Sequence, residues 1–200
     1  MIKPELQAFI DKVAEPAQKD YERTSVFPSL VIAQAILESG WGKSKLAVEA
    51  NNLFGMRGEY NGSSVMGSDD DVDKDGNRHP VMIPFRKYPS FAESMQDHGA
   101  TLMKDRYLPV RNAKDYKEGA QALYNGGYAG DRDYPSKLIT IIEKYNLAQY
   151  DAVKRYHKVV SGNTVSGLAK EYGSTIEDIK KWNDLDDKYL IKVGQVLRVK

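Results

Sequence analysis

The 200-residue sequence contains no cysteine and only three histidines, His79, His98 and His157. The lack of cysteine excludes disulfide bonds, thiolate metal sites and a cysteine nucleophile. The histidines stand too far apart in the chain to form a two-histidine metal site on one helix. No stretch approaches the roughly 18 apolar residues of a membrane-spanning helix, so we expect no membrane insertion. The formal net charge of +1 is unlike the strongly basic balance typical of nucleic-acid-binding proteins.

The charge distribution indicates two parts. Residues 1–150 carry 19 basic and 21 acidic side chains, whereas residues 151–200 carry 10 basic and 7 acidic ones. We therefore expect one domain over 1–150 and a second, smaller domain over 154–200, joined by a very short linker.

Apolar spacing predicts that the first domain is mainly helical. Residues 6–17 form one amphipathic helix, which we expect to be bent or broken at Pro16. Ser29 is expected to cap a second, almost wholly apolar helix over 30–39, which Gly40 ends. The remaining elements are a β-hairpin over 58–86 and helices from the Ser90–Glu93 capping box to about 104, over 114–124 and over 135–145.

The second domain shows a β-α-α-β pattern. Strands around 156–160 and 195–199 enclose two short helices over 165–172 and 175–182. A segment this short buries only a small core, which is typical of a binding module. The predicted fold class of the whole chain is therefore α+β.

Glu38 is the first candidate catalytic residue. It ends the apolar helix, where the partial negative charge of the helix C-terminus disfavours a carboxylate. Apolar surroundings and the neighbouring Trp41 disfavour the charged form further, so we expect a raised pKa. Such a carboxylic acid can protonate a glycosidic oxygen. Taken alone, Glu38 leaves open the alternative of a solvated carboxylate at a helix end.

Three segments resemble, in order, the motifs of glycoside hydrolase family 73. They are residues 31–44, which include Glu38 followed by Ser-Gly-Trp-Gly, then 51–55 and 124–134. That family comprises peptidoglycan N-acetylglucosaminidases with a lysozyme-like fold, so the resemblance implies this fold and activity for residues 1–150. It also implies that Glu38 is the general acid.

The third motif supplies the substrate-binding residues that the resemblance implies, namely Tyr128, Asp131 and Tyr134. It departs from the family pattern by placing Gly130 and Arg132 where threonine and proline are usual. Aromatic rings stack on pyranose rings, which adds Trp41 to the candidates, although packing in the core is its alternative.

The resemblance implies a second catalytic carboxylate in the β-hairpin, and counting from Ser64-Val65 leads to Asp71, with Asp69 and Asp70 as competitors. The same stretch resembles the start of a calcium loop, with Asp71, Asp73 and Asp75 as alternate ligands. A complete EF-hand is excluded because Met82 stands where its closing glutamate would be. The sequence leaves open a calcium site or a solvated acidic tip, and it predicts no required cofactor.

Residues 155–200 resemble a LysM module, through the stretch 156–165, Trp182-Asn183 and 191–195. LysM modules bind the N-acetylglucosamine backbone of peptidoglycan or chitin, which implies that Gly162, Asn163, Thr164 and Ile191 bind sugar. Turn geometry is the alternative role of Gly162.

Together these features predict a monomeric peptidoglycan hydrolase that cleaves the β-1,4 bond after N-acetylglucosamine within glycan strands. Because the first 21 residues contain no apolar signal segment, we expect a phage endolysin that is made in the cytoplasm and released to the cell wall by another protein. A bacterial autolysin whose signal has been removed is the alternative origin. A lytic transglycosylase or a muramidase on the same fold is the alternative activity, and a non-catalytic wall-binding protein is a third.

Overall fold

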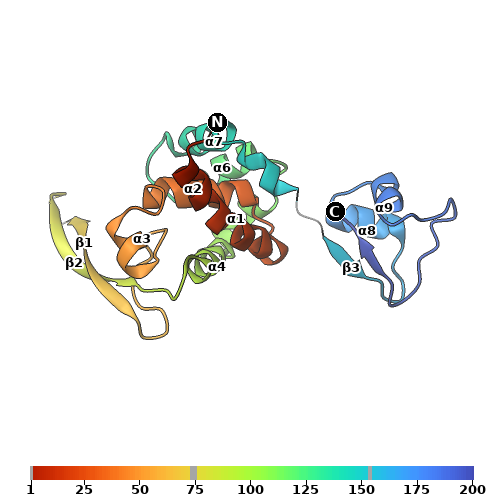
Figure 1. The fold of residues 1–200 in the computed structure, drawn as a ribbon, viewed down its shortest axis with the longest axis horizontal. Helices are drawn as coiled ribbons and strands as arrows, with labels where there is room; N and C mark the ends of the chain where they lie inside the picture. The colour runs from red at the N-terminus through yellow and green to blue at the C-terminus, as the bar shows by residue number, and fades with distance from the viewer. Residues whose placement is uncertain (1, 73–75, 153–154) are drawn as a thin grey trace. The chain divides into compact units, whose positions relative to one another are not determined.

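Helices and one hairpin make up the first part of the computed structural model (Figure 1). The structure describes residues 2–72, 76–152 and 155–200, without the side chains of Asp71, Val72 and Arg78. The chain forms two units, Met1–Asp151 and Ala152–Lys200. The first contains α1 (Pro4–Thr24), α2 (Pro28–Ser39), α3 (Lys45–Ala50), β1 (Ser64–Val72), β2 (Arg78–Arg86), α4 (Phe91–Leu102), η1 (Asp105–Tyr107), α5 (Leu108–Arg111), α6 (Tyr116–Asn125), α7 (Tyr134–Lys144) and η2 (Leu147–Asp151).

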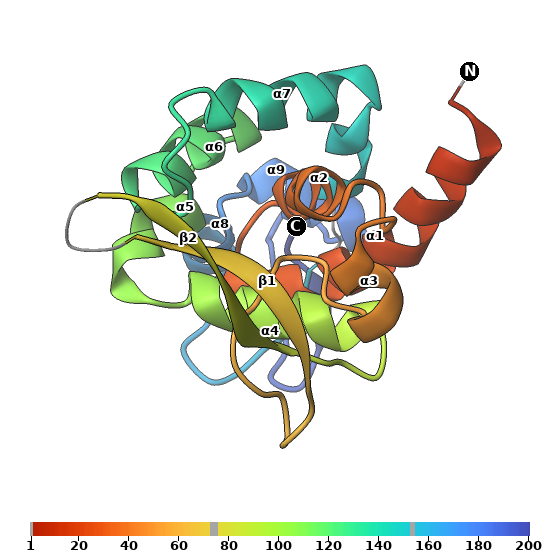
Figure 2. The same ribbon diagram turned by 90° about the vertical axis from the view of Figure 1, so that its left-hand side faces the viewer.

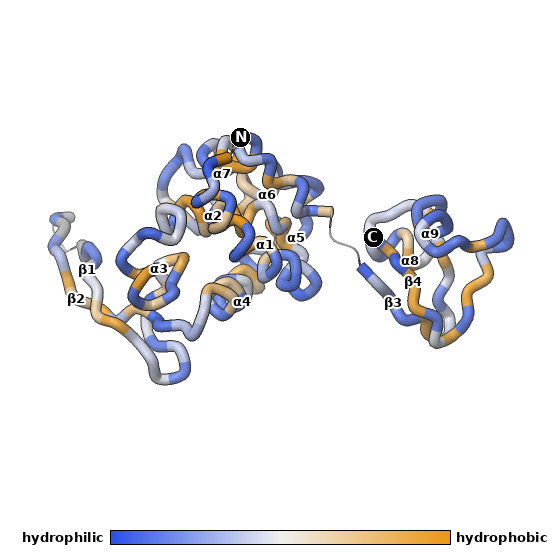
Figure 3. The backbone as a smooth tube through the Cα atoms, viewed as in Figure 1, coloured by the Kyte–Doolittle hydropathy of each residue, from blue (hydrophilic) through white to orange (hydrophobic). Residues whose placement is uncertain are grey.

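Helix α2 is the centre of the first unit. It contacts α1, α6, α7 and η2, and Figure 2 shows it nearly end-on among its neighbours. Residues 28–36 are all buried, and the hydropathy colouring marks its apolar segment (Figure 3). A helix that is apolar on nearly all sides is stable only inside a core, and this position fixes the helix whose last turn carries Glu38.

The predicted N-cap of α2 is wrong. The helix begins at Pro28, with Phe27 as a cap that makes no side-chain hydrogen bond, because proline suits the first helical position. Ser29 therefore lies inside the first turn. Its backbone N–H and its hydroxyl donate to the two carboxylate oxygens of Asp151, at 2.7 and 2.6 Å. A residue from η2 thus binds the positive end of the helix.

Helix α1 continues through Pro16, so of the two predicted alternatives, a bend or a break, the break is wrong. Proline removes one backbone hydrogen bond, but the flanking Val13, Ala14 and Ala17 are all buried against the core. Tertiary packing of this face holds the helix together across the proline.

The predicted β-hairpin is present, with β1 and β2 antiparallel from Ser64↔Arg86 to Val72↔Arg78. Its base is attached to α4, because Arg86 Nη1 and Tyr88 Oη both donate to Asp97 Oδ2, at 2.5 and 2.6 Å. These charge-assisted bonds fix where the hairpin leaves the helical part.

The second unit contains β3 (Tyr156–Lys158), α8 (Val165–Tyr172), α9 (Ile176–Trp182) and β4 (Val196–Arg198), with β3 and β4 antiparallel. Its small core consists of Val159, Val165, Leu168, Ala169, Ile179, Leu197 and Val199. The α+β class and the βααβ pattern are confirmed. No helix among the described residues is long and apolar enough to cross a membrane.

Candidate active site

A strained turn follows Glu38 at the end of α2. Gly40, Trp41 and Gly42 all have positive φ, at +55°, +64° and +71°, and a bulky residue such as tryptophan rarely adopts this conformation. Ser39 stabilises the turn, since its buried hydroxyl donates to Ala35 O at 2.5 Å and accepts from Gly42 N at 2.7 Å. The backbone after Glu38 is therefore held in place by local hydrogen bonds.

Tyr134 connects Glu38 to the core. Its hydroxyl donates to Glu38 Oε1 at 2.9 Å and accepts from Gln34 Nε2 at 3.1 Å. Gln34 and Glu38 lie one turn apart on α2, so they share a face of the helix, while Tyr134 is the first residue of α7. The third sequence motif and the first are thereby joined at one carboxyl group.

Glu38 has the electrostatics of a general acid. The residue is exposed to solvent as a whole, but the protein surrounding its carboxyl group removes part of the hydration and raises the pKa, and the bond from Tyr134 opposes this only in part. The direction is the one that the sequence predicts. A raised pKa leaves a larger fraction of the carboxyl group protonated at a given pH, which is the direction that a general acid needs.

Tyr128 lies against Tyr134, with ring centroids 5.7 Å apart and an angle of 26° between the rings. Its hydroxyl is 3.0 Å from Nε2 of His98, which is completely buried and stacks on Phe54 at 3.9 Å. Burial lowers the pKa of His98 to about 3, so the imidazole is neutral at working pH. Burial, followed by the charge of Glu38, raises the pKa of Tyr128 well above its ordinary value.

Two other predicted binding residues have structural contacts of their own. Asp131 is exposed. Its side chain accepts from the backbone N–H of Asp133, just before α7, at 2.9 Å, and from Nζ of Lys137, in the first turn of α7, at 2.5 Å. Trp41 is half-buried and packs edge-on against Phe9 and Tyr145, at 6.1 and 4.7 Å. Both sets of contacts match the role of fixing the elements that hold Glu38 and Tyr134.

The acidic residues of the hairpin separate by position. Asp69 Oδ2 pairs with Nη2 of Arg57 at 2.5 Å, whereas Asp70 is exposed. Asp71 lies in β1 opposite His79, and its side chain is not among those that the structure describes. The identity of the second catalytic carboxylate therefore stays a prediction.

The predicted calcium loop falls largely outside the described residues. Asp73 and Asp75 belong to the undescribed segment, and so does the side chain of Asp71. Within the described part of the chain, no three His, Asp or Glu side chains gather in a way that could hold a metal ion. Calcium binding stays a prediction.

A groove of about 750 Å³ lies on the second unit, and three of the four predicted sugar-binding residues, Asn163, Thr164 and Ile191, line it. Gly162 does not line the groove; it has a φ of +89°, the turn role that was its alternative. The Asn163 side chain also accepts from Val160 N and contacts His157 Nε2, both at 2.8 Å, which fixes the turn beside the groove.

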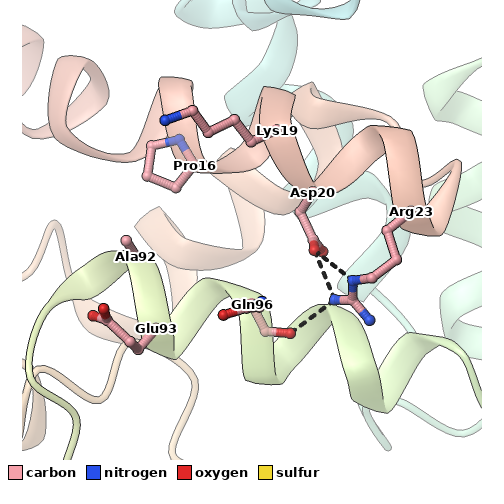
Figure 4. Close-up of a pocket in the computed structure, with 7 residues that line it drawn as sticks. All are labelled: Pro16, Lys19, Asp20, Arg23, Ala92, Glu93 and Gln96. Carbon is pink, nitrogen blue, oxygen red and sulfur yellow. Dashed lines mark hydrogen bonds and ion pairs between the residues drawn. The ribbon is translucent and has the colours of Figure 1, made fainter.

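A further cavity of about 320 Å³ between α1 and α4 contains no predicted site residue (Figure 4). In it Arg23 donates to Asp20 Oδ1 and to Gln96 O, at 2.6 and 2.9 Å. Burial raises the pKa of Asp20, and the bond from Arg23 opposes this. The cluster joins α1 to α4.

Gln34 and His98 are site residues that sequence reasoning did not assign to the site. Gln34 is the one polar residue within the apolar run before Glu38, and this was the available signal for it. No sequence signal pairs His98 with Tyr128, because the contact depends on how α4 packs beside the loop before α7.

A helical domain with a small hairpin, carrying a carboxyl group of raised pKa beside two tyrosines, has the proton donor that the glycosidase class of protein requires. The comparisons identify the family. Residues 14–147 match the family model named glucosaminidase and described as mannosyl-glycoprotein endo-beta-N-acetylglucosaminidase, and residues 157–200 match the LysM domain. The chain belongs to the glucosaminidase family of glycoside hydrolases and ends in a LysM domain.

Similar proteins are known from several bacteria. The exo-glucosaminidase LytG of Bacillus subtilis is 45% identical over 92% of this chain and 65% of its own length. An autolysin of Enterococcus faecalis is 34% identical over 96% of this chain and 30% of its own. The catalytic domain of the autolysin Auto of Listeria monocytogenes superimposes with a TM-score of 0.69 at 37% identity, over 76% of this chain and 90% of that domain. The chain thus spans less than two thirds of the length of LytG and less than a third of the length of the Enterococcus autolysin.

Proposed function

We propose that this protein hydrolyses the β-1,4 bond after N-acetylglucosamine in peptidoglycan, with Glu38 as the general acid. The observation that carries the proposal is the Glu38 carboxyl group, whose pKa is raised by partial loss of hydration and whose Oε1 accepts from Tyr134. Membership of the glucosaminidase family and similarity to proteins named autolysin and exo-glucosaminidase support the substrate.

In the proposed reaction the proton of Glu38 passes to the glycosidic oxygen as the bond to the sugar carbon breaks. Water then adds to the sugar carbon and loses a proton to a base, or the acetamido group of the substrate assists. Asp71 is the proposed base, and Asp69 and Asp70 are its competitors. Replacing each by asparagine should leave one variant with a dominant loss of rate. Wild-type rates in all three variants would place the base elsewhere or favour the assisted route.

Product analysis tests the proposal. Muropeptides released from purified sacculi should carry reducing N-acetylglucosamine ends, as measured by borohydride reduction and mass spectrometry. Reducing N-acetylmuramic acid ends would show a muramidase, and 1,6-anhydromuramic acid ends would show a lytic transglycosylase. Because one relative is named an exo-glucosaminidase, size analysis of early products should separate cleavage within strands, which we propose, from release of single terminal sugars.

We further propose that the LysM unit holds the enzyme at the bacterial cell wall, through the groove lined by Asn163, Thr164 and Ile191. A tethered enzyme meets its polymer at a raised effective concentration, so even weak binding increases the rate on intact walls. The fragment 152–200 should pellet with purified peptidoglycan and be released by N-acetylglucosamine oligomers. Replacing Ile191 by serine should weaken pelleting, whereas the same change at Val193, which is 71% exposed and does not line the groove, should not.

A further inference from the structure

The hydrogen bond between Tyr134 and Glu38 has a direction, and the structure shows what sets it. A tyrosine hydroxyl has one proton to donate and can also accept. Here Gln34 Nε2, which can only donate, occupies the acceptor side of the hydroxyl at 3.1 Å. The single proton of Tyr134 is then directed to Glu38 Oε1, 2.9 Å away.

We propose that Gln34 is a positioning residue that makes Tyr134 a donor to Glu38, so that the acid proton of Glu38 resides on Oε2. When Glu38 is protonated, Oε1 accepts from Tyr134, which leaves Oε2 as the oxygen that carries the transferable proton. The inference rests on the proposed role of Glu38 as general acid and deepens it.

The reverse arrangement shows why the amide matters. If a hydrogen-bond acceptor occupied the position of Gln34 Nε2, the hydroxyl of Tyr134 would donate to that acceptor and could only accept from Glu38. The proton of Glu38 would then lie on Oε1, bound to Tyr134, and would not be available to a substrate oxygen. Gln34 therefore decides between an available and an occupied acid proton.

The surroundings of Gln34 agree with a functional role. Its side chain is completely buried, and its Oε1 has no hydrogen-bond partner among the described residues. A buried oxygen without a partner is costly, so such a group calls for a functional explanation. The bond to Tyr134 is therefore the one hydrogen bond of the Gln34 side chain among the described residues.

The titratable groups that act on Glu38 are few. Tyr134, from α7, contacts it directly, and Tyr128, from the loop before α7, is close enough for the charge of Glu38 to raise its pKa. Both tyrosines have pKa values above their ordinary value and stay neutral at working pH. A change in the titration of Glu38 on altering Gln34 is therefore transmitted by the Tyr134 hydroxyl rather than by a new charge.

The test combines Gln34→Met, which keeps the side-chain length but removes both polar atoms, with Tyr134→Phe. The pKa of Glu38 is measured by ¹³C NMR of glutamate-labelled full-length protein, with the resonance assigned by its loss in Glu38→Gln. We expect Gln34→Met to raise this pKa and to lower kcat about tenfold with little change in KM, since one oriented hydrogen bond is worth about that factor. In the Tyr134→Phe background the same change should move the pKa less than half as far.

Gln18→Met is the matched control, because Gln18 also donates one side-chain hydrogen bond within the first unit, to Tyr150 O near the end of that unit. It should leave the pKa of Glu38 and kcat unchanged. Equal pKa shifts from Gln34→Met in both backgrounds, or none in either, would overturn the inference.

Tyr134→Phe alone gives a second test that does not depend on whether Gln34→Met folds. If Tyr134 donates to Glu38, its loss raises the pKa of Glu38; a fall in that pKa would show that Tyr134 accepts and would refute the inference. The NMR titration needs no substrate, so wild-type protein that does not cleave peptidoglycan would refute the proposed function while leaving the hydrogen-bond direction measurable.

Discussion

The bond between Asp151 and Ser29 makes the last residue of the first unit a support of the helix that carries Glu38. Sequence reasoning places the end of the catalytic domain at residue 150, which would discard this support. We predict that Asp151→Ala destabilises the first unit substantially, and that a fragment ending at 150 is less stable than one ending at 152.

The magnitude follows from two contributions. Losing a side chain that caps a helix N-terminus costs about 0.5–2 kcal/mol. Leaving the hydroxyl of Ser29, which is 0% exposed, without its acceptor costs about 1–3 kcal/mol. Since the two overlap, we expect the free energy of unfolding to fall by about 2–3 kcal/mol, and Tm by roughly 5–10 °C for a unit of this size. Asp151→Asn keeps an acceptor but loses the charge, and should cost about 1 kcal/mol.

The chain offers a clean assay, because its two tryptophans lie in different units. In a Trp182→Phe background, urea unfolding followed by the fluorescence of Trp41 reports on the first unit alone. Glu49→Ala, which removes an exposed carboxylate from α3, is the control and should change the midpoint little. An Asp151→Ala midpoint equal to that of the control would refute the capping argument.

Three other predictions concern charge and packing. His98 has a pKa of about 3 in the fold against 6.5 in the unfolded chain. Its contribution to the free energy of unfolding should therefore be complete above pH 6.5 and be lost as the pH falls toward 3, by up to about 1.4 kcal/mol per pH unit. In His98→Gln this slope, measured by urea unfolding, should become shallower. Glu38 has a raised pKa in the fold, so its ionisation costs stability as the pH rises through that pKa, and Glu38→Gln should raise Tm more at pH 7 than at pH 4; an equal change at both would contradict the raised pKa. Gly99→Ala would place a Cβ 1.8 Å from Asp20 Oδ2, so it should displace Asp20 and lower Tm by several degrees, whereas Gly130→Ala, with open space around it, should not.

Periodicity predicted the elements well, because their burial follows local apolar spacing. The helix over 165–172 is an example, since its regularly spaced Val165, Leu168 and Ala169 are the residues that are buried. Ser29 shows where a local rule fails. Serine suits an N-cap, but the proline before it suits the first helical position, so the helix begins at Pro28 rather than at residue 30. Pro16 shows tertiary packing overriding the local preference of proline.

The candidate site was predictable only as separate motifs. Glu38 and its raised pKa follow from the helix end, but the contact from Gln34 to Tyr134 joins residues 100 positions apart. The bond from Ser29 to Asp151 spans 122 positions. Such contacts depend on how α2, α7 and η2 pack together, and no single-sequence pattern contains that information.

The most direct test of the central claim is the rate at which Glu38→Gln releases reducing ends from purified sacculi. The amide keeps the shape of the side chain and can still accept from Tyr134, but it has no acid proton to donate. We predict a rate lower by about 10²–10⁴-fold, with peptidoglycan pelleting and Tm at least as high as in the wild type. A Glu38→Gln protein that retains more than about a tenth of the wild-type rate would contradict the assignment of Glu38 as the general acid.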